Sequence, residues 1–368
     1  MAVTVGLDTS PLAALNTGTE EVLDGLLHGL YQVGQAVVPL APPRQALDME
    51  ARSLGLTPTA RPSHRAKWRW ETAGLARAAA AAGVDVVHVP YLAHPPRPLP
   101  VPTVVTVHDL IPYLYPGYQQ RWRTRWYFRR LAARLPYASR LVAVSEATWH
   151  DIALVFPAWH ARVVVIPNGV HPQYFLPPDA AELQSARQEL GLREGEDRDT
   201  PVLLYAGGYQ PHKNVPLLLK AVQAAREAMP HLRLLLAGAA GQLDEAAAPG
   251  ATLLPRVSRA RLAALYALAT VVVCPSRYEG FGLPAAQGLA AGTPVVASDI
   301  PAHREVLGEA ACLLPVDDPA AWAEALTALL QDPARRRELA AAGRERAGAF
   351  RWERAARQYQ ALYHGEAP

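Results

Sequence analysis

Short apolar segments rich in β-branched residues alternate along the chain with longer stretches of helical pattern. The first set of apolar segments is Val3–Gly6, Val86–Val89, Val104–Val107, Leu141–Val144 and Val163–Ile166. A second set follows a polar gap, at Val202–Tyr205, Leu232–Ala237, Thr252–Leu254, Val271–Val273 and Pro294–Ala297. Strands that alternate with helices form parallel sheets that are covered on both faces. The pattern therefore predicts an α/β protein with two doubly wound, Rossmann-like sheets.

The polar gap between the two sets predicts a domain boundary after Phe175. A turn signal, Leu-Pro-Pro-Asp, occupies positions 176–179, and the charged stretch Arg193–Asp199 follows a short predicted helix. We assign residues 1–175 to a first domain and residues 176–349 to a second. An Asp before Pro319 and another before Pro333 predict two capped helices. Residues 350–368 carry a last predicted helix, over about 352–364.

Composition narrows the class of protein. The chain has 368 residues, half of them hydrophobic, which is enough for two cores. Its net charge of +3 is too small for a dedicated nucleic-acid binder. Two cysteines make no disulfide framework, so a reducing cytoplasm is the simplest compartment. The N-terminus lacks the features of a signal peptide, and glycines and prolines interrupt the longest uncharged stretches. Any membrane contact is therefore expected to be peripheral.

The most specific motif runs from Ser276 to Ser298, SRYEGFGLPAAQGLAAGTPVVAS. It joins a predicted buried strand, the turn Gly280-Phe281-Gly282-Leu283 and a helix that opens at Pro284. The N–H groups and the dipole of such a helix start bind anions, and the glycines let the backbone approach a diphosphate. Glu279 and Gln287 add a carboxylate and an amide for hydroxyl groups. The motif indicates a sugar-nucleotide site; the alternative is a tight turn with an incidental Glu.

A second loop, from Tyr205 to Asn214, also joins a predicted strand to a helix. Gly207 and Gly208 allow a tight turn, and Lys213 can place its ammonium group on a phosphate. The loop lacks the spacing of a P-loop. The alternative is a solvated lysine, but the helix dipole disfavours a cation at a helix start.

Three further segments supply weaker candidates. His108 and Asp109 follow a buried strand, at the edge where ligands of open α/β sheets bind; alternatively they only brace the strand end. Gly18 opens the first helix, without a dinucleotide fingerprint. Val257 precedes another predicted helix start, at Ser258.

Taken together, these segments resemble the retaining glycosyltransferases of family four, or group 1, which have the GT-B fold. The resemblance implies two Rossmann-like domains that face a cleft, the first for the acceptor and the second for the nucleotide sugar. It implies that Glu279 holds the donor sugar, that Lys213 neutralises the pyrophosphate and that His108 contacts the transferred sugar. Gln287 stands where the family has a second Glu, which binds the ribose.

The same resemblance implies roles for the weaker candidates. Gly18 approaches the donor phosphates, the backbone at Val257 contacts the base, and the terminal helix crosses back to the first domain. The family often carries an Arg after the first glycine of the Lys213 loop, where this chain has Gly208-Tyr209. One positive charge is therefore missing, and the chain also has His212 beside Lys213 in place of the usual Arg.

We expect a retaining, metal-independent transfer of a hexose from a nucleotide sugar to a glycan or lipid-linked acceptor. No metal or cofactor is expected, because the Asp-x-Asp sequence Asp197-Arg-Asp199, which could bind a divalent metal at a strand end, lies in the charged linker. The HDLIP and EGFGLP segments favour a GDP-mannose-type donor. The alternatives are a non-enzymatic sugar-nucleotide-binding protein, suggested by Gln287, Gly208 and His171, and a sugar-nucleotide epimerase.

Two basic, aromatic segments lie in the first predicted domain, His64–Trp70 and Arg121–Arg130. Tryptophan and arginine on one helix suit an anionic membrane surface, so Arg121, Trp122, Arg125 and Trp126 are candidates for peripheral contact at the inner face of the membrane. The alternative is a packed or solvated helix, and no motif supports nucleic-acid binding.

Overall fold

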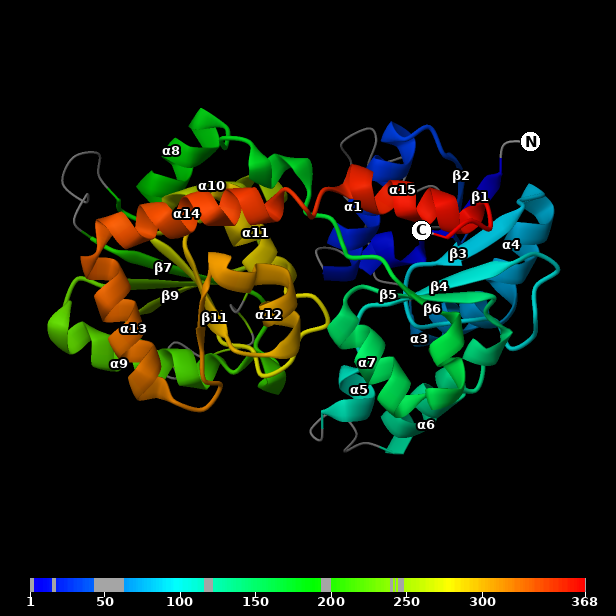
Figure 1. The fold of residues 1–368 in the computed structure, drawn as a ribbon, viewed down its shortest axis with the longest axis horizontal. Coiled ribbons are helices and arrows are strands. Elements are labelled where there is room, and N and C mark those ends of the chain that lie inside the picture. The colour runs from blue at the N-terminus through cyan, green and yellow to red at the C-terminus, as the bar shows by residue number, and fades with distance from the viewer. Residues whose placement is uncertain are drawn as a thin grey trace. The chain divides into compact units, whose positions relative to one another are not determined.

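The computed structural model describes residues 3–14, 18–42, 63–115, 122–192, 200–238, 241, 243 and 248–367. The chain divides into two compact units. The first joins Met1–Gly169 to Trp352–Pro368, and the second is the continuous run Val170–Arg351. Figure 1 labels the elements of both units.

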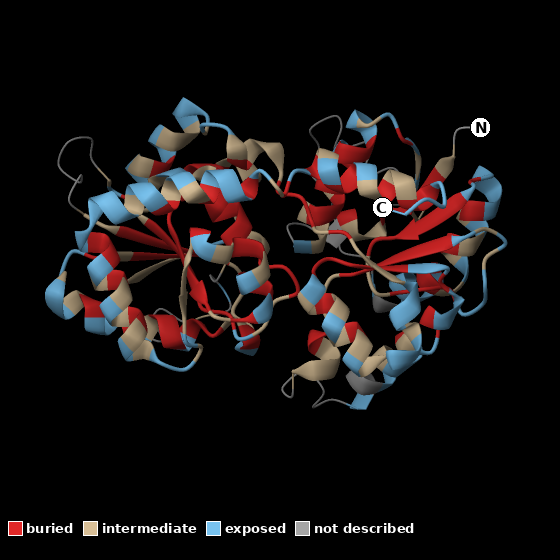
Figure 2. Cartoon of the chain, viewed as in Figure 1, coloured by how far each residue is buried: buried red, intermediate tan, exposed pale blue. Residues whose placement is uncertain are grey.

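The first unit is built on a six-stranded parallel sheet in the order β2-β1-β3-β4-β5-β6. The strands are β1 (Thr4–Asp8), β2 (Ala36–Leu40), β3 (Val86–Val89), β4 (Thr103–Val107), β5 (Arg140–Ala143) and β6 (Val163–Val165). The longer α-helices are α1 (Gly18–Gln32), α3 (His64–Arg69), α4 (Leu75–Ala82), α6 (Trp122–Ala132), α7 (Glu146–Val155) and α15 (Trp352–Tyr363), and α5 (Ile111–Leu114) is a single turn. The inner strands β3 and β4 are buried throughout, as the red strands of Figure 2 show.

The second unit repeats this architecture with the strand order β12-β11-β10-β7-β8-β9, again all parallel. The strands are β7 (Val202–Ala206), β8 (Arg233–Ala237), β9 (Ala251–Leu254), β10 (Val271–Cys274), β11 (Val295–Ser298) and β12 (Cys312–Leu314). The helices are α8 (Ala180–Glu189), α9 (Val215–Ala228), α10 (Arg259–Leu268), α11 (Leu283–Ala291), α12 (Pro301–Leu307), α13 (Pro319–Gln331) and α14 (Pro333–Ala347).

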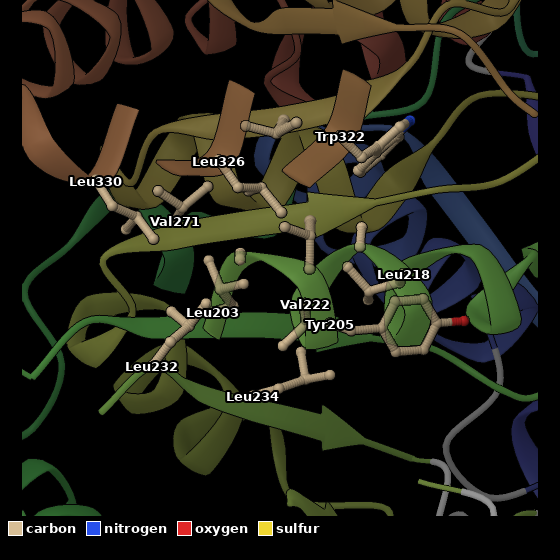
Figure 3. Packing of buried hydrophobic residues seen from close by; sticks show 14 of the residues in the cluster. Leu203, Tyr205, Leu218, Val222, Leu232, Leu234, Val271, Trp322, Leu326 and Leu330 are labelled. Carbon is tan, nitrogen blue, oxygen red and sulfur yellow. The ribbon is translucent and has the colours of Figure 1, made fainter. Parts of the chain in front are cut away.

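The core of the second unit lies between the sheet and the helix pair α9 and α13. Leu203 and Val271 from the strands meet Val222 of α9, with Leu326 and Trp322 of α13, in one buried cluster (Figure 3). Burying such side chains stabilises the fold by about 1.5–3 kcal/mol each. This core fixes the sheet whose strand ends carry the candidate site.

The C-terminal helix α15 belongs to the first unit and packs against α1. Trp352, at its start, is buried against Gly25 and Gly29 of α1 and against Gly169. A Cβ at Gly25 would overlap the Trp352 indole, so glycine is required there for close approach. The α1 helix and the last helix therefore form one packed layer.

Buried polar contacts also tie α15 to the sheet of the first unit. His88 Nδ1 lies 2.6 Å from the Tyr363 hydroxyl, and His88 Nε2 lies 2.8 Å from the Thr106 hydroxyl. The Tyr359 hydroxyl lies 3.1 Å from Thr106 Oγ1. Burial lowers the pKa of His88 to about 3. The ring is therefore neutral near pH 7, so one of its nitrogens donates to a hydroxyl group and the other accepts from one.

The predicted fold class, two doubly wound parallel sheets, is confirmed. Asp318 and Asp332 cap α13 and α14 as predicted. Strands β2 and β12 were not predicted: β2 contains Pro39, which disfavours a strand, and β12, Cys-Leu-Leu, has no β-branched residue. Among the described residues, no helix combines the length and apolarity that crossing a membrane requires.

Candidate functional site

The candidate site of the second unit lies where β7 and β10 end. These strands are neighbours and parallel, so their carboxyl ends meet at the same edge of the sheet. The chain leaves β7 through the glycine pair Gly207-Gly208 and a short 3-10 helix, Pro211–Lys213. It leaves β10 through the loop that carries Ser276, Glu279 and the glycine turn, and then enters α11.

Lys213 and Glu279, 66 residues apart in sequence, form an ion pair at this edge. Lys213 Nζ donates to Glu279 Oε1 at 2.6 Å, and Ser276 Oγ donates to the same oxygen at 2.7 Å. The two charged side chains are only 18% and 13% exposed. Both contacts use Oε1, and no hydrogen bond from the described residues reaches Oε2. The pair therefore holds the carboxylate in place and leaves one of its oxygens for another partner.

The pKa of Glu279 reflects this environment. Burial raises the pKa of the carboxyl group, but the Lys213 ammonium, His303 and the hydrogen bonds from Lys213 and Ser276 outweigh burial and bring the pKa below its ordinary value. Glu279 is therefore an ionised carboxylate near neutral pH.

Lys213 is positioned by the turn that follows it. Asn214 adopts a left-handed conformation, with φ of 55°, which asparagine tolerates better than most residues. Its side-chain amide donates to the Val316 carbonyl at 2.9 Å. The Arg277 N–H donates to the His212 carbonyl at 2.7 Å, which joins the Lys213 loop to the Glu279 loop. The preceding glycine pair is braced by the Tyr205 hydroxyl, which donates to the Gly208 carbonyl at 2.6 Å.

The glycine turn forms the start of α11, which begins at Leu283, one residue before the predicted opening at Pro284. Gly282 caps the helix with φ of 85°, a conformation that favours glycine. Phe281 is buried and meets the ring of Phe350 edge-on, with 5.4 Å between centroids. The structure therefore has a glycine-capped helix start at the position that the sequence predicted.

Both residues of the ion pair line a small hollow of about 10 Å³. Its lining includes Lys213, Ser276, Glu279, Gly282 and His303. His303 of α12 was not predicted as a site residue. Its segment, Asp299-Ile-Pro-Ala-His303, has the sequence of an ordinary helix start, and only the fold shows that the ring is 1% exposed and packed on Gly282.

Gln287 is placed differently from the other predicted residues of this motif. Its side chain is buried, and Oε1 lies 3.0 Å from the Tyr266 hydroxyl, which also lies 3.0 Å from the Pro284 carbonyl. Gln287 does not line the hollow of Lys213 and Glu279. The amide therefore meets α10, whereas the carboxylate of Glu279 meets Lys213.

Val257, the residue predicted to meet a base, lines a second and larger hollow of about 280 Å³. The N-cap Ser258 and the partly buried Arg261 of α10 lie in the same lining. Arg261 forms ion pairs with Glu182 and Glu189 of α8. The hollow is therefore bordered by both hydrogen-bond donors and acceptors.

The remaining predicted residues belong to the first unit. His108 Nε2 lies 2.8 Å from the Pro90 carbonyl, which can only accept, so Nε2 carries the hydrogen. Burial lowers the pKa of His108. Asp109 Oδ1 accepts from the Ile111 N–H at 3.0 Å and so braces the turn before α5. Gly18 is the exposed first residue of α1, with open space around its Cα.

The basic, aromatic segment is described in part. Trp122 and Trp126 of α6 are 71% and 50% exposed, and the Arg130 guanidinium lies 4.2 Å from the Trp126 ring centroid. Arg121 and the side chain of Arg125 lie outside the described residues, as do Asp197 and Asp199. Within the described ranges, no group of three or more His, Cys, Asp or Glu could hold a metal ion.

Two family models match the chain. The model described as Glycosyltransferase Family 4 matches residues 16–174, and the model described as Glycosyl transferases group 1 matches residues 200–332. An alpha-maltose-1-phosphate synthase of Mycolicibacterium smegmatis is 30% identical over 294 residues, which cover 72% of this chain and 73% of the relative. A D-inositol 3-phosphate glycosyltransferase of Xylanimonas cellulosilytica is 36% identical over 233 residues, 59% of this chain and 54% of the relative. This chain thus spans about half the length of the D-inositol 3-phosphate glycosyltransferase.

A solved structure agrees with these matches. The Anabaena protein HepE, solved in complex with UDP-glucose, aligns with a TM-score of 0.72 and 17% identity, over 99% of this chain and 100% of that one. At this identity the likeness shows the fold alone.

Proposed function

Because the chain belongs to the family 4, group 1 glycosyltransferases of the GT-B fold, we propose that it transfers a sugar from a nucleotide-sugar donor to an acceptor hydroxyl. The observation that carries the proposal is the Lys213–Glu279 pair beside the glycine turn of α11. An ammonium and a helix start suit a diphosphate, and a fixed carboxylate suits sugar hydroxyls. These groups come from two distant loops, and in the fold they share one hollow.

Each group has a proposed role in the transfer. Glu279 accepts hydrogen bonds from the donor sugar through Oε2, while Oε1 stays with Lys213 and Ser276. In the reaction, the bond from the anomeric carbon to the diphosphate breaks, and a bond to the acceptor oxygen forms with retention. The acceptor proton passes to the leaving phosphate. Lys213 and the first N–H groups of α11 stabilise the charge that develops on that phosphate.

By the family resemblance, the first unit is proposed to bind the acceptor, and His108 is proposed to contact the transferred sugar. With its hydrogen on Nε2, the neutral His108 ring presents Nδ1 as an acceptor for a sugar hydroxyl. Gly18, Asp109 and the Gly207-Gly208 loop are proposed to lie along the donor, as the family resemblance implies.

The larger hollow beside Val257 is proposed to take the nucleobase. Its volume of about 280 Å³ suits one aromatic base, and its border of Ser258, Arg261 and two glutamates offers donors and acceptors. Gln287 is proposed to bind the ribose by turning from Tyr266.

The transferred sugar is proposed to be a hexose, with mannose as the first candidate. The test is a panel of nucleotide sugars, GDP-mannose, UDP-glucose, UDP-N-acetylglucosamine and ADP-glucose, ranked by thermal shift, because a tighter ligand stabilises the fold more. The donors that bind are then incubated with a glycan, a lipid-linked sugar or inositol 3-phosphate. Acceptor-dependent release of nucleoside diphosphate supports the proposal, and no release with any pair contradicts it.

The same assay separates the alternatives. A non-enzymatic binder would show a thermal shift without release of the diphosphate. An epimerase would convert the nucleotide sugar without an acceptor.

The transfer is proposed to need no metal, since Lys213 and the helix N–H groups supply the positive charge at the leaving group. Activity that persists in excess chelator supports this proposal. Full loss of activity that manganese restores contradicts it.

Peripheral membrane contact through α6 is proposed as an addition to this function. It is supported by the exposure of Trp122 and Trp126 and by Arg130 stacked beside Trp126. Indole rings and arginines favour the headgroup layer of an anionic bilayer. Flotation with anionic liposomes at low salt tests it, with Trp122→Ser/Trp126→Ser as the comparison. Equal flotation of both proteins, or none, contradicts it.

A further inference from the structure

His303 is a buried histidine that borders the same hollow as Lys213 and Glu279. It lies on α12, which follows β11, and its side chain contacts the glycine turn. A Cβ at Gly282 would lie 2.8 Å from His303 Cδ2 and 3.0 Å from Nε2. The edge of the ring that carries Nε2 therefore packs directly on Gly282, the N-cap residue of α11.

The hydrogen-bond partner of His303 fixes the state of the neutral ring. Nδ1 lies 2.8 Å from the Ser298 carbonyl, which can only accept. Nδ1 therefore carries the hydrogen, and Nε2 has a lone pair that can accept a proton. Burial lowers the pKa of His303, against the opposite influence of Glu279, so the ring is neutral in the free protein near pH 7.

Without a bound ligand, the charged groups that face His303 form ion pairs with one another, so their charges offset. Lys213 of the 3-10 helix and Glu279 of the loop before α11 pair with each other. Cys274 at the end of β10 is neutral, since burial raises its thiol pKa to about 12, and burial also keeps the Tyr205 phenol of β7 neutral. On and beside its own helix, Asp299 and Arg304 pair at the surface. A bound diphosphate would therefore be the dominant uncompensated charge near the ring.

We propose that His303 is a further donor-binding residue, which takes up a proton at Nε2 when a nucleoside diphosphate binds and then acts with Lys213 as a second positive charge. The proposal rests on the proposed function, because it requires that this site binds a diphosphate. A nearby anion favours the charged form of an imidazole. The added charge replaces the one that the Gly208-Tyr209 segment lacks relative to the family pattern.

The hollow beside His303 is too small to hold a diphosphate. About 10 Å³ holds at most one water molecule, so the diphosphate lies outside, on the glycine turn. The imidazolium acts across Gly282 by its charge, and one water in the hollow can accept the hydrogen of Nε2. In a buried site such a charge is weakly screened.

The test measures proton uptake on binding. UDP, GDP and ADP are titrated into the protein by calorimetry at pH 7 in two buffers that differ in ionisation enthalpy, and the difference in heat gives the protons taken up. His303→Asn is the key variant, because its amide can still donate to the Ser298 carbonyl but does not titrate. His94→Asn is the matched control: His94 is a second buried histidine whose Nδ1 lies beside a backbone carbonyl, that of Pro95, and it belongs to the first unit, outside the hollow of Lys213 and Glu279. The titration of the ligand itself is the same for all three proteins.

We expect the wild type and His94→Asn to take up a larger fraction of a proton than His303→Asn. We also expect the affinity advantage of the wild type over His303→Asn to be about tenfold at pH 6 and to vanish by about pH 8.5, because the imidazolium loses its charge as the pH rises. Equal proton uptake with intact binding overturns the role of His303 and leaves the proposed function standing. If none of the three nucleotides binds the wild type, both proposals fall.

A second measurement applies if His303→Asn does not fold. In wild type labelled with ¹⁵N-histidine, the ring nitrogens report the charge of each imidazole. One buried imidazole that changes from neutral to charged when the tightest of the three nucleotides is added supports the proposal. No histidine that changes overturns it.

Discussion

The Lys213 ammonium lies 2.6 Å from Oε1 of Glu279, and the Ser276 hydroxyl holds that same oxygen at 2.7 Å. The pair joins two loops at the end of neighbouring strands, and it is largely withdrawn from water. A buried ion pair is rarely the most stable arrangement that a fold could adopt, because both charges lose hydration. Its presence at a sheet edge is better explained by the anion and the hydroxyl groups that it can bind.

Replacing Lys213 by alanine should weaken the binding of the nucleoside diphosphate product about ten- to hundredfold. The reason is the loss of one charge-assisted contact, worth about 1.5–3 kcal/mol. Isothermal titration with UDP, GDP and ADP measures the change. Lys213→Arg, which keeps the charge, should retain most of the affinity, and equal affinity in Lys213→Ala and wild type would exclude a role for the ammonium.

The Glu279 carboxylate should make the fold sensitive to acid. Its native pKa is below the ordinary value, so its contribution to the free energy of unfolding is complete above the ordinary carboxyl pKa. The contribution is lost as the pH falls through the lowered native value. Urea unfolding of wild type and Glu279→Gln between pH 7 and pH 3 should show a difference in stability that narrows at the acid end. A difference that stays constant to pH 3 would contradict the prediction.

Gln287→Glu should tighten the binding of ribonucleoside diphosphates about fivefold. A carboxylate adds charge assistance to its hydrogen bonds with the ribose hydroxyls, worth about 1 kcal/mol. Titration with the ribo and the 2′-deoxy form of the same nucleotide measures the effect. The gain should be smaller for the deoxy form, and an equal gain for both would refute ribose contact at this position.

Gly25→Ala should lower the free energy of unfolding by about 1–3 kcal/mol or more, because the added methyl group overlaps the Trp352 indole in a packed layer. Gly18→Ala is the matched control on the same helix, since a Cβ at Gly18 would meet nothing within 4 Å. Urea unfolding of the two variants gives the comparison. If they prove equally stable, the close packing of α1 on α15 does not limit stability.

The sequence predicted most of the fold because its strong signals are local. Ten apolar segments mark ten of the twelve strands in the described part of the chain, and the aspartates before Pro319 and Pro333 cap α13 and α14. The two strands that were missed, β2 and β12, are edge strands. Both are apolar, but β2 contains Pro39 and β12 has no β-branched residue, so neither carries the usual pattern of a strand.

The candidate site could be predicted only in part, for a related reason. The loops around Lys213 and Glu279 each carry recognisable chemistry, and the family resemblance links them. The partners of each side chain depend on tertiary packing. No periodicity shows that Gln287 turns to Tyr266 or that His303 reaches Gly282, because those contacts join residues from separate elements of the sheet edge.

Because the last helix returns to the first unit, the two units differ in how they can be expressed separately. The second unit is a single uninterrupted span, Val170–Arg351, so a gene fragment for that span would encode every strand of its sheet together with Lys213, Glu279 and His303. The first unit is assembled from both chain ends. A fragment that stops at Gly169 would lack α15, so the glycine face of α1 would be uncovered. Expressing the first unit on its own therefore requires the C-terminal segment to be fused to such a fragment.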